Sequence, residues 1–174
     1  MRHLKYLNYA LAAALCVFAA VVWPDLPERI PSHFNGRGEV DGWARKGFAS
    51  WFLLPAIGLV TLVILHASAW AVLRWPGMLN IPSKKQFLEL PRAEQEPILR
   101  LTESCMHAIG TMIIWMFGAI QWATYRSAFG YPTRGLMQAV LIVSMVLTPV
   151  IAVVLLARTS SMVTEAHRRS VGQN

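Results

Sequence analysis

Four long apolar runs alternate with polar intervals along the chain. They predict helices over about residues 6–23, 48–73, 101–125 and 135–157, with an earlier start near Glu94 left open for the third, because each run is predominantly apolar and at least about 18 residues long, which is enough to cross a bilayer. The first run ends at Val21-Val22-Trp23-Pro24 without a small-residue cleavage site, so we interpret it as a retained helix rather than a signal peptide. The pattern predicts an all-α fold, an integral membrane four-helix bundle in which residues 1–174 form a single transmembrane domain.

Two long polar intervals join these runs. Residues 24–47 read PDLPERIPSHFNGRGEVDGWARKG. Their prolines favour extended backbone, and Asn35-Gly36 with Gly38 predict a tight turn. We expect an ordered, mainly extended loop that turns in its middle. The second interval, 74–100, predicts a short amphipathic helix over 84–90 that Pro91 ends. The polar tail from Arg158 is predicted to fray.

Composition supports a membrane protein. The chain is 55% hydrophobic and only 14% charged, and its mean hydropathy is +0.44. By these values the chain is too apolar for a soluble domain of this size, so the lipid bilayer is its first expected partner. The formal net charge of +7 is spread over every polar interval without a dense basic run, which argues against a nucleic-acid partner. Cys16 and Cys105 both lie in apolar runs, where we expect small buried side chains rather than a disulfide.

The basic residues predict an orientation. With the N-terminus inside, the inner set holds ten of them and the outer set six. The inner set is Arg2, Lys5, Arg74, Lys84, Lys85, Arg92, Arg100, Arg158, Arg168 and Arg169, and the outer set is Arg29, Arg37, Arg45, Lys46, Arg126 and Arg134. Both termini and interval 74–100 are therefore predicted to be cytoplasmic, with interval 24–47 outside.

The outer interval carries the first group of candidate binding residues, His33, Asn35, Gly38, Glu39, Asp41 and Trp43. Residues two apart in an extended segment point to the same face, which pairs His33 with Asn35 and Glu39 with Asp41. Such a set can bind a divalent cation or a basic peptide. In the alternative, Asn35 and Asp41 cap turns and His33 donates to a backbone carbonyl, which leaves the loop as a recognition surface. We adopt this second interpretation.

A second group of candidates lies inside the predicted membrane region. His66 precedes Leu73 by 7 residues and His107 follows Leu101 by 6. In antiparallel helices, both histidines therefore lie about 10 Å from the same inner boundary. Together with Glu103 they can relay protons or hold a metal, since ionisable residues in this position are functional candidates. The alternative is a set of polar contacts between helices. The sequence leaves the identity of any metal open.

From Leu26 to Trp43 the prolines, His33, Asn35, Gly38 and Asp41-Gly42 follow one fixed order. This order resembles a bacterial membrane family, a domain of unknown function shared with the N-terminal part of SdpI-like immunity and signalling proteins. Asn80-Ile81-Pro82-x-Lys84 looks like a second motif of that family, and the resemblance covers about residues 6–120. It implies a multi-pass protein of the bacterial cytoplasmic (inner) membrane. In the best-known relative it implies immunity to a secreted peptide toxin, coupled to sequestration of a repressor at the membrane.

No enzyme motif is present: the chain lacks a nucleophile elbow, a phosphate loop, His-Glu-x-x-His and Cys-x-x-Cys. We therefore expect a non-enzymatic SdpI-like membrane protein without a cofactor, which gives toxin immunity or transmits a signal through the outer loop. Its expected partners are a peptide toxin outside and a protein inside, and both homo- and hetero-oligomers stay open. One alternative is an accessory subunit or small carrier of a larger membrane complex. Another is a metal-dependent membrane enzyme built on the intramembrane cluster.

Overall fold

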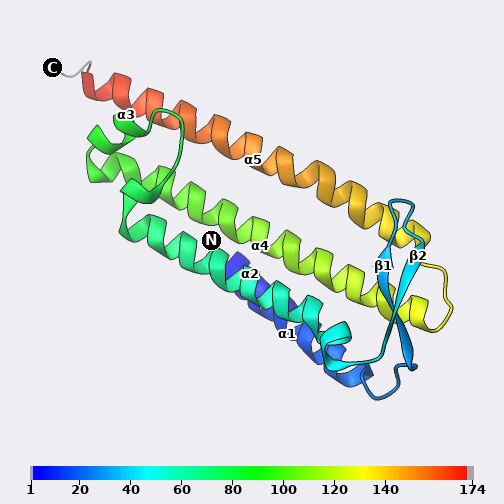
Figure 1. Cartoon of the computed structure of the whole chain (residues 1–174). Helices are drawn as coiled ribbons and strands as arrows, with labels where there is room; N and C mark the ends of the chain where they lie inside the picture. Colours follow the sequence, from blue (N-terminus) through cyan, green and yellow to red (C-terminus); the bar gives the residue numbers. More distant parts are fainter. Residues whose placement is uncertain (1, 172–174) are drawn as a thin grey trace.

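The computed structural model describes residues 2–171, with side chains described for 3–169. Four long helices lie side by side (Figure 1): α1 Arg2–Val22, α2 Phe48–Arg74, α4 Arg92–Ala128 and α5 Arg134–Val171. By length and composition, all four can cross a membrane. The prediction of a mainly helical protein with four helices long and apolar enough to cross a membrane is confirmed.

Helix α4 is the centre of the bundle, because the other three long helices all pack against it. Its buried positions recur at steps of three and four, which places them along one side of a helix; they include Leu99, Thr102, His107, Gly110, Ile114 and Gln121. Close approach is possible at Gly110, where an added Cβ would lie 3.0 Å from Asn8 Nδ2 and 3.1 Å from Leu62 Cδ1.

One end of the bundle, the hairpin end, is capped by two antiparallel strands, β1 Arg29–Phe34 and β2 Val40–Arg45 (Figure 1). The register pairs Arg29 with Arg45 and Phe34 with Val40. Ile30 is fully buried against Trp51 and Leu26. The predicted extended segment with a central turn is thus a β-hairpin, so the fold is helical with one small sheet rather than all-α.

The opposite end, the α3 end, holds a 3-10 turn at Pro76–Met78 and the short helix α3, Lys84–Glu89. One predicted boundary is wrong here, because α5 continues past Ala157 to Val171 rather than fraying. Helix α4 begins at Arg92, close to the earlier of its two predicted starts, near Glu94. A shared apolar core explains both extensions. Its members are Val72, Leu79, Ile81, Phe87, Leu90, Ile98, Leu99, Val163 and Ala166.

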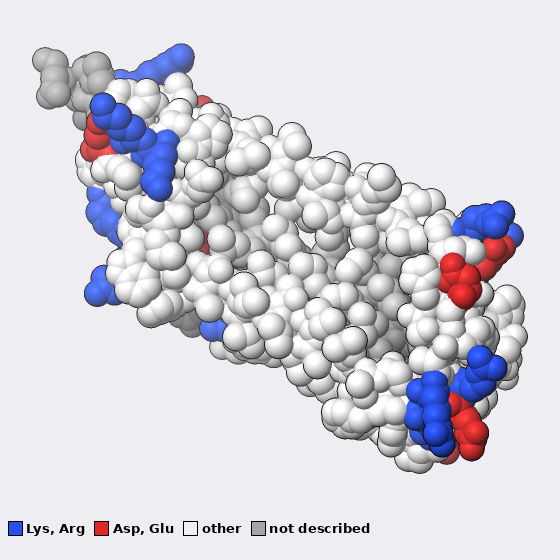
Figure 2. Space-filling view, viewed as in Figure 1, with Lys and Arg blue, Asp and Glu red and all other residues white. Residues whose placement is uncertain are grey.

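Charged side chains gather at the two ends of the molecule, and the surface between them is almost free of charge on the face shown in Figure 2. Helix α4 has 37 residues, a length of about 55 Å at 1.5 Å per residue. The hydrocarbon core of a bilayer is only about 30 Å thick. Helices α4 and α5 are therefore longer than a span requires, and their extra turns support α3.

Candidate functional site

Asn35 organises the turn of the hairpin. Its Oδ1 accepts hydrogen bonds from the backbone N–H groups of Arg37 at 2.9 Å and Glu39 at 3.1 Å. Its own N–H donates to the Glu39 carbonyl at 2.9 Å. Asn35 is thus the turn-capping residue that one of the two sequence interpretations expected, because an Asx side chain can replace a backbone partner in a turn.

Gly38 joins this turn to the start of α5. Its φ is +74°, and it is buried. An added Cβ would lie 2.8 Å from the carbonyl oxygen of Arg134 and 2.9 Å from Cβ of Met137. The next residue adds an exposed ion pair at the same place, since Glu39 Oε1 lies 3.1 Å from Arg134 Nη1. The tip of the hairpin therefore rests directly on the first turn of α5.

The contacts of His33 and Asp41 differ from those that the sequence predicted. The Nδ1 atom of His33 contacts the carboxylate of Asp41 on the neighbouring strand. His33 therefore does not donate to a backbone carbonyl, and Asp41 does not cap a turn. The pair is 69% and 45% exposed, so water screens it and it contributes little to stability. Trp43 on β2 is also 46% exposed. These three side chains are open to a partner.

The predicted outer residues consequently share one hairpin but form two separate pairs. His33 is paired with Asp41, and Asn35 with Glu39, whose Oε2 accepts from Asn35 Nδ2 at 3.4 Å. Sequence reasoning missed the residue that holds the base of this loop. Lys46 Nζ donates to the carbonyls of Pro24 at 3.1 Å and Leu26 at 2.9 Å.

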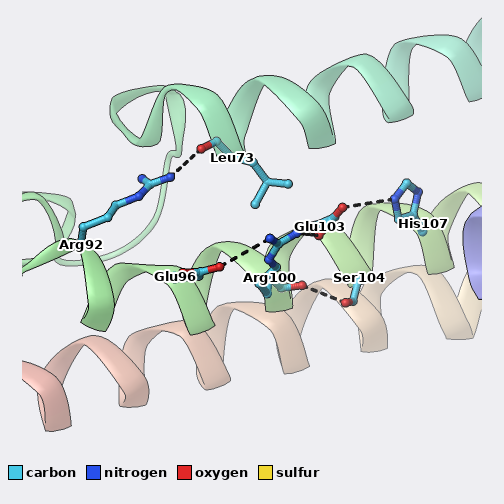
Figure 3. A network of polar contacts seen from close by, with 7 residues as sticks. All are labelled: Leu73, Arg92, Glu96, Arg100, Glu103, Ser104 and His107. Atoms are coloured by element: carbon cyan, nitrogen blue, oxygen red, sulfur yellow. Dashed lines mark hydrogen bonds and ion pairs between the residues drawn. The ribbon is translucent and has the colours of Figure 1, made fainter. Parts of the chain in front are cut away.

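The intramembrane candidates do come together. The rings of His66 on α2 and His107 on α4 meet edge to face, with centroids 4.7 Å apart. Glu103 Oε1 lies 3.9 Å from His107 Nε2, one turn earlier on α4. Figure 3 shows that this contact ends a ladder of charges along α4, in which Arg100 bridges Glu96 at 3.4 Å and Glu103 at 3.2 Å. This row of ion pairs connects the histidine pair to the α3 end.

Asn8 is the member of this cluster that sequence reasoning missed. It is fully buried on α1. Its Nδ2 donates to the His107 carbonyl at 3.0 Å and lies 3.3 Å from His66 Nε2, while its Oδ1 accepts from Thr111 Oγ1 at 2.6 Å. The available signal was a lone amide inside the first apolar run. Asn8 thereby ties α1 to α2 and α4.

These contacts fix the direction of the hydrogen bonds between Asn8 and the two histidines. A carbonyl only accepts, so the atom of Asn8 that faces His107 must be its NH₂ group. The same NH₂ group then donates to His66 Nε2, which leaves the ring proton on Nδ1. His66 Nδ1 lies 3.3 Å from the Tyr9 hydroxyl and donates to it. His66 is therefore a neutral ring held between two residues of α1.

The cluster has the chemistry of polar contacts between helices. Within residues 2–171, no group of three or more His, Cys, Asp or Glu side chains is arranged to hold a metal ion. One Glu103 oxygen is already bonded to Arg100. The Nδ1 atom of His107 is buried without a hydrogen-bond partner. Asn8, His66 and Thr111 thus satisfy one another's polar atoms, as a low-dielectric interior requires, and His107 Nδ1 is the exception.

The candidates in the inner interval lie around the start of α3. Asn80 and Pro82 are exposed and Lys84 is half-buried, whereas the intervening Ile81 is buried. Ser83 has a φ of +61°, in the left-handed region, immediately before α3 begins. The alternation turns the predicted residues toward the surface, while their apolar neighbours anchor the segment.

Comparison with known proteins gives one match. Residues 10–59 match the family described as Domain of unknown function (DUF1648). This segment runs from α1 through the hairpin into α2 and is less than a third of the chain. The second motif, at Asn80, lies outside it. Searches of curated proteins and of solved structures found no match. The chain thus contains a segment similar to that domain, and the likeness to SdpI-like proteins stays a prediction.

Proposed function

We propose that this chain is a multi-pass protein of the bacterial cytoplasmic membrane that recognises a partner at its hairpin end and transmits the event to its α3 end. Its specific form is a non-enzymatic, SdpI-like role in immunity to a secreted peptide toxin. The observation that carries the proposal is the contact of the hairpin tip with the first turn of α5, through Gly38 and the Glu39–Arg134 ion pair.

The distribution of charge supports placement across a membrane. Charged side chains occupy both ends and leave a broad, almost uncharged surface between them on the face shown in Figure 2. Large apolar side chains such as Ile142, Met145 and Val153 are more than 60% exposed along α5. Exposed apolar area of this extent is unfavourable in water and matches the hydrocarbon core of a bilayer.

The path of α5 supports transmission. This helix runs without a break from Arg134, below the hairpin, to Val171 at the α3 end. There its Val163 and Ala166 enter the same core as Phe87 of α3. A rigid element that contacts both ends can carry a displacement from one to the other when its position has two stable arrangements. A partner that shifts the hairpin would therefore act on the segment containing Lys84.

The exposed side of the hairpin supports recognition. Trp43 offers apolar and aromatic area, and the His33–Asp41 pair beside it offers an imidazole and a carboxylate. Tryptophan is a frequent anchor in protein interfaces. A peptide with an apolar residue and hydrogen-bonding or basic side chains fits this surface.

Orientation can be tested by labelling. Ser32 and Ser83 are exposed at opposite ends of the molecule. In a variant with Cys16 and Cys105 replaced by alanine, Ser32→Cys should react with a membrane-impermeant thiol reagent in intact cells. Ser83→Cys should react only after the membrane is permeabilised. The reverse pattern would place the hairpin in the cytoplasm and exclude recognition of an external toxin.

The immunity role can be tested by expressing the chain in a toxin-sensitive bacterium and challenging it with a panel of secreted peptide toxins. We expect protection against at least one toxin, and its loss in Trp43→Ala and Asp41→Asn at equal membrane abundance. Tyr131→Ala is the matched control, because Tyr131 is an exposed aromatic residue at the same end but outside the hairpin. Protection that survives both hairpin substitutions, or no protection by the wild-type chain, refutes this role.

One observation favours a second candidate, an accessory subunit of a larger membrane complex. Helix α5 is the least buried of the four candidate spans, so much of its apolar surface is open to another protein. Purification in mild detergent distinguishes this candidate, since a subunit should bring partner chains with it in fixed stoichiometry.

A further inference from the structure

A groove runs between α1 and α2 on the apolar surface that separates the hairpin end from the α3 end. It encloses about 620 Å³. Its walls include Ala13 and Cys16 from α1 and Leu59 and Val63 from α2. Small side chains on α1 keep it open, and its lining is mostly apolar. A second hollow of about 370 Å³ shares Cys16 and Leu59 with it and extends it toward the hairpin end.

The polar residues of this groove all lie at the end of the groove nearer to α3, which we call its inner end. They are Lys5 and Tyr9 of α1 and His66 of α2, with Trp70 beside them. Lys5 and Cys16 lie about 16 Å apart along α1, at about 1.5 Å per residue. One leaflet is half of a hydrocarbon core of about 30 Å, or about 15 Å. The groove therefore has the length of one leaflet, with its polar end where the headgroups lie.

The hydrogen bonds of the buried cluster determine what the polar end offers. His66 donates its Nδ1 proton to the Tyr9 hydroxyl, because Asn8 donates to its Nε2. The Tyr9 oxygen thus accepts inside the protein, and its own proton is left to donate outward. Tyr9 is 47% exposed, so this donor can reach a ligand in the groove.

Lys5 adds a positive charge to this donor. Its Nζ lies 5.9 Å from the centre of the Tyr9 ring. Among residues 3–169, no carboxylate forms an ion pair with Lys5. The inner end thus presents an ammonium and a hydroxyl donor, and no described carboxylate pairs with that ammonium. Such a pair is complementary to anionic phosphate oxygens.

We propose that the α1–α2 groove binds an anionic phospholipid, with an acyl chain along its apolar walls and the phosphate at Lys5 and Tyr9. The inference rests on the membrane placement in the proposed function but not on recognition by the hairpin. The apolar length matches an acyl chain, and the unpaired cation at one end matches its headgroup. A partner helix would use the apolar walls but would not require the donor pair.

Native mass spectrometry of the intact protein in detergent tests this proposal, with phosphatidylglycerol and phosphatidylethanolamine added at equal concentration. We expect the wild-type chain to retain phosphatidylglycerol preferentially. Lys5→Gln and Tyr9→Phe should each weaken that retention, Lys5→Gln by about tenfold, as expected for loss of a charged hydrogen bond. Ala13→Phe, which places a ring in the groove, should reduce binding of both lipids.

Two controls separate this site from general effects of charge and aromatic content. Lys84→Gln removes a cation from the α3 end, and Tyr131→Phe removes an exposed phenol from the hairpin end, and neither residue lines the groove. Both should retain lipid as the wild type does. Equal retention in all variants, or no preference of the wild type for the anionic lipid, overturns the proposal. A change of oligomeric mass in Ala13→Phe without loss of lipid would make the groove a protein interface instead.

Discussion

Replacement of Gly38 tests how the hairpin is joined to the bundle. Gly38 is buried and has a φ of +74°, which is unfavourable for any residue with a Cβ. The added methyl group of Gly38→Ala would lie 2.8 Å from the Arg134 carbonyl oxygen and 2.9 Å from Met137 Cβ. Both neighbours belong to α5, so relief of the clash requires the hairpin tip and α5 to separate.

Two contributions set the size of the effect. The left-handed backbone costs a residue with a Cβ about 1–2 kcal/mol. Overpacking against well-ordered neighbours adds about 1–3 kcal/mol. We therefore expect Gly38→Ala to destabilise the docked hairpin by about 2–5 kcal/mol, and Gly38→Val to cost more. The matched control is Gly36→Ala, because Gly36 lies in the same turn with nothing within 4 Å of its added Cβ and without a positive φ.

Hydrogen exchange of the hairpin amides is the appropriate assay, since a local opening can escape a measurement of global unfolding. The N–H groups of Asn35 and Gly38 are bonded within the turn. A loss of 2 kcal/mol corresponds to about 30-fold faster exchange where these amides exchange by undocking of the hairpin. Gly36→Ala should change the rate by less than threefold, as an exposed loop substitution usually changes stability by only about 0.5 kcal/mol. Equal protection in the two alanine variants would show that the hairpin is not held by its contact with α5.

Three further predictions concern the hairpin base, the histidine pair and the α3 end. Lys46→Met should lower the free energy of unfolding by about 1 kcal/mol through loss of its hydrogen bonds to two carbonyls, whereas Arg45→Met should leave that free energy unchanged. In a double-mutant cycle of His66→Ala and His107→Ala, the coupling energy should be on the order of 0.6 kcal/mol, the average for polar contacts in membrane bundles. If the effects of the two substitutions on the free energy of unfolding are strictly additive, the two rings do not interact. Val163→Ala should cost about 2 kcal/mol, at about 0.8 kcal/mol for each buried carbon removed, and an unchanged unfolding temperature would mean that the end of α5 is frayed after all.

The sequence predicted those elements whose signal lies in one local pattern. Apolar runs located the helices, and Asn35 with Gly38 located the turn, because both depend on neighbouring residues. The equal depth of His66 and His107 followed from antiparallel geometry, and the rings do meet. Partners from distant segments were not predictable in the same way. The Asn8 contacts with α2 and α4 depend on how the helices rotate about their axes, which no single segment encodes.

The end of α5 shows how a real signal can be misread. Residues 158–171 were predicted to fray because they are polar on average. Thr159, Val163 and Ala166 nevertheless follow one another at steps of four and three, and all three are buried. Mean polarity and helical periodicity are different properties, and only the second decides whether a helix has a face to bury. The extension forms because α3 and the first turns of α4 supply the opposite half of its core.

The segment that matches the domain of unknown function, residues 10–59, depends on the rest of the chain for its structure. Within it, α1 and α2 contact each other less than either contacts α4. Trp51 donates to the Ala19 carbonyl inside the segment, but its own carbonyl accepts from Gln121 of α4. The hairpin likewise rests on Arg134, which lies outside the match. In this chain the segment is therefore held in place by helices outside the match, and under the proposed function α5, which supports the hairpin, is the helix that would transmit a movement of the hairpin.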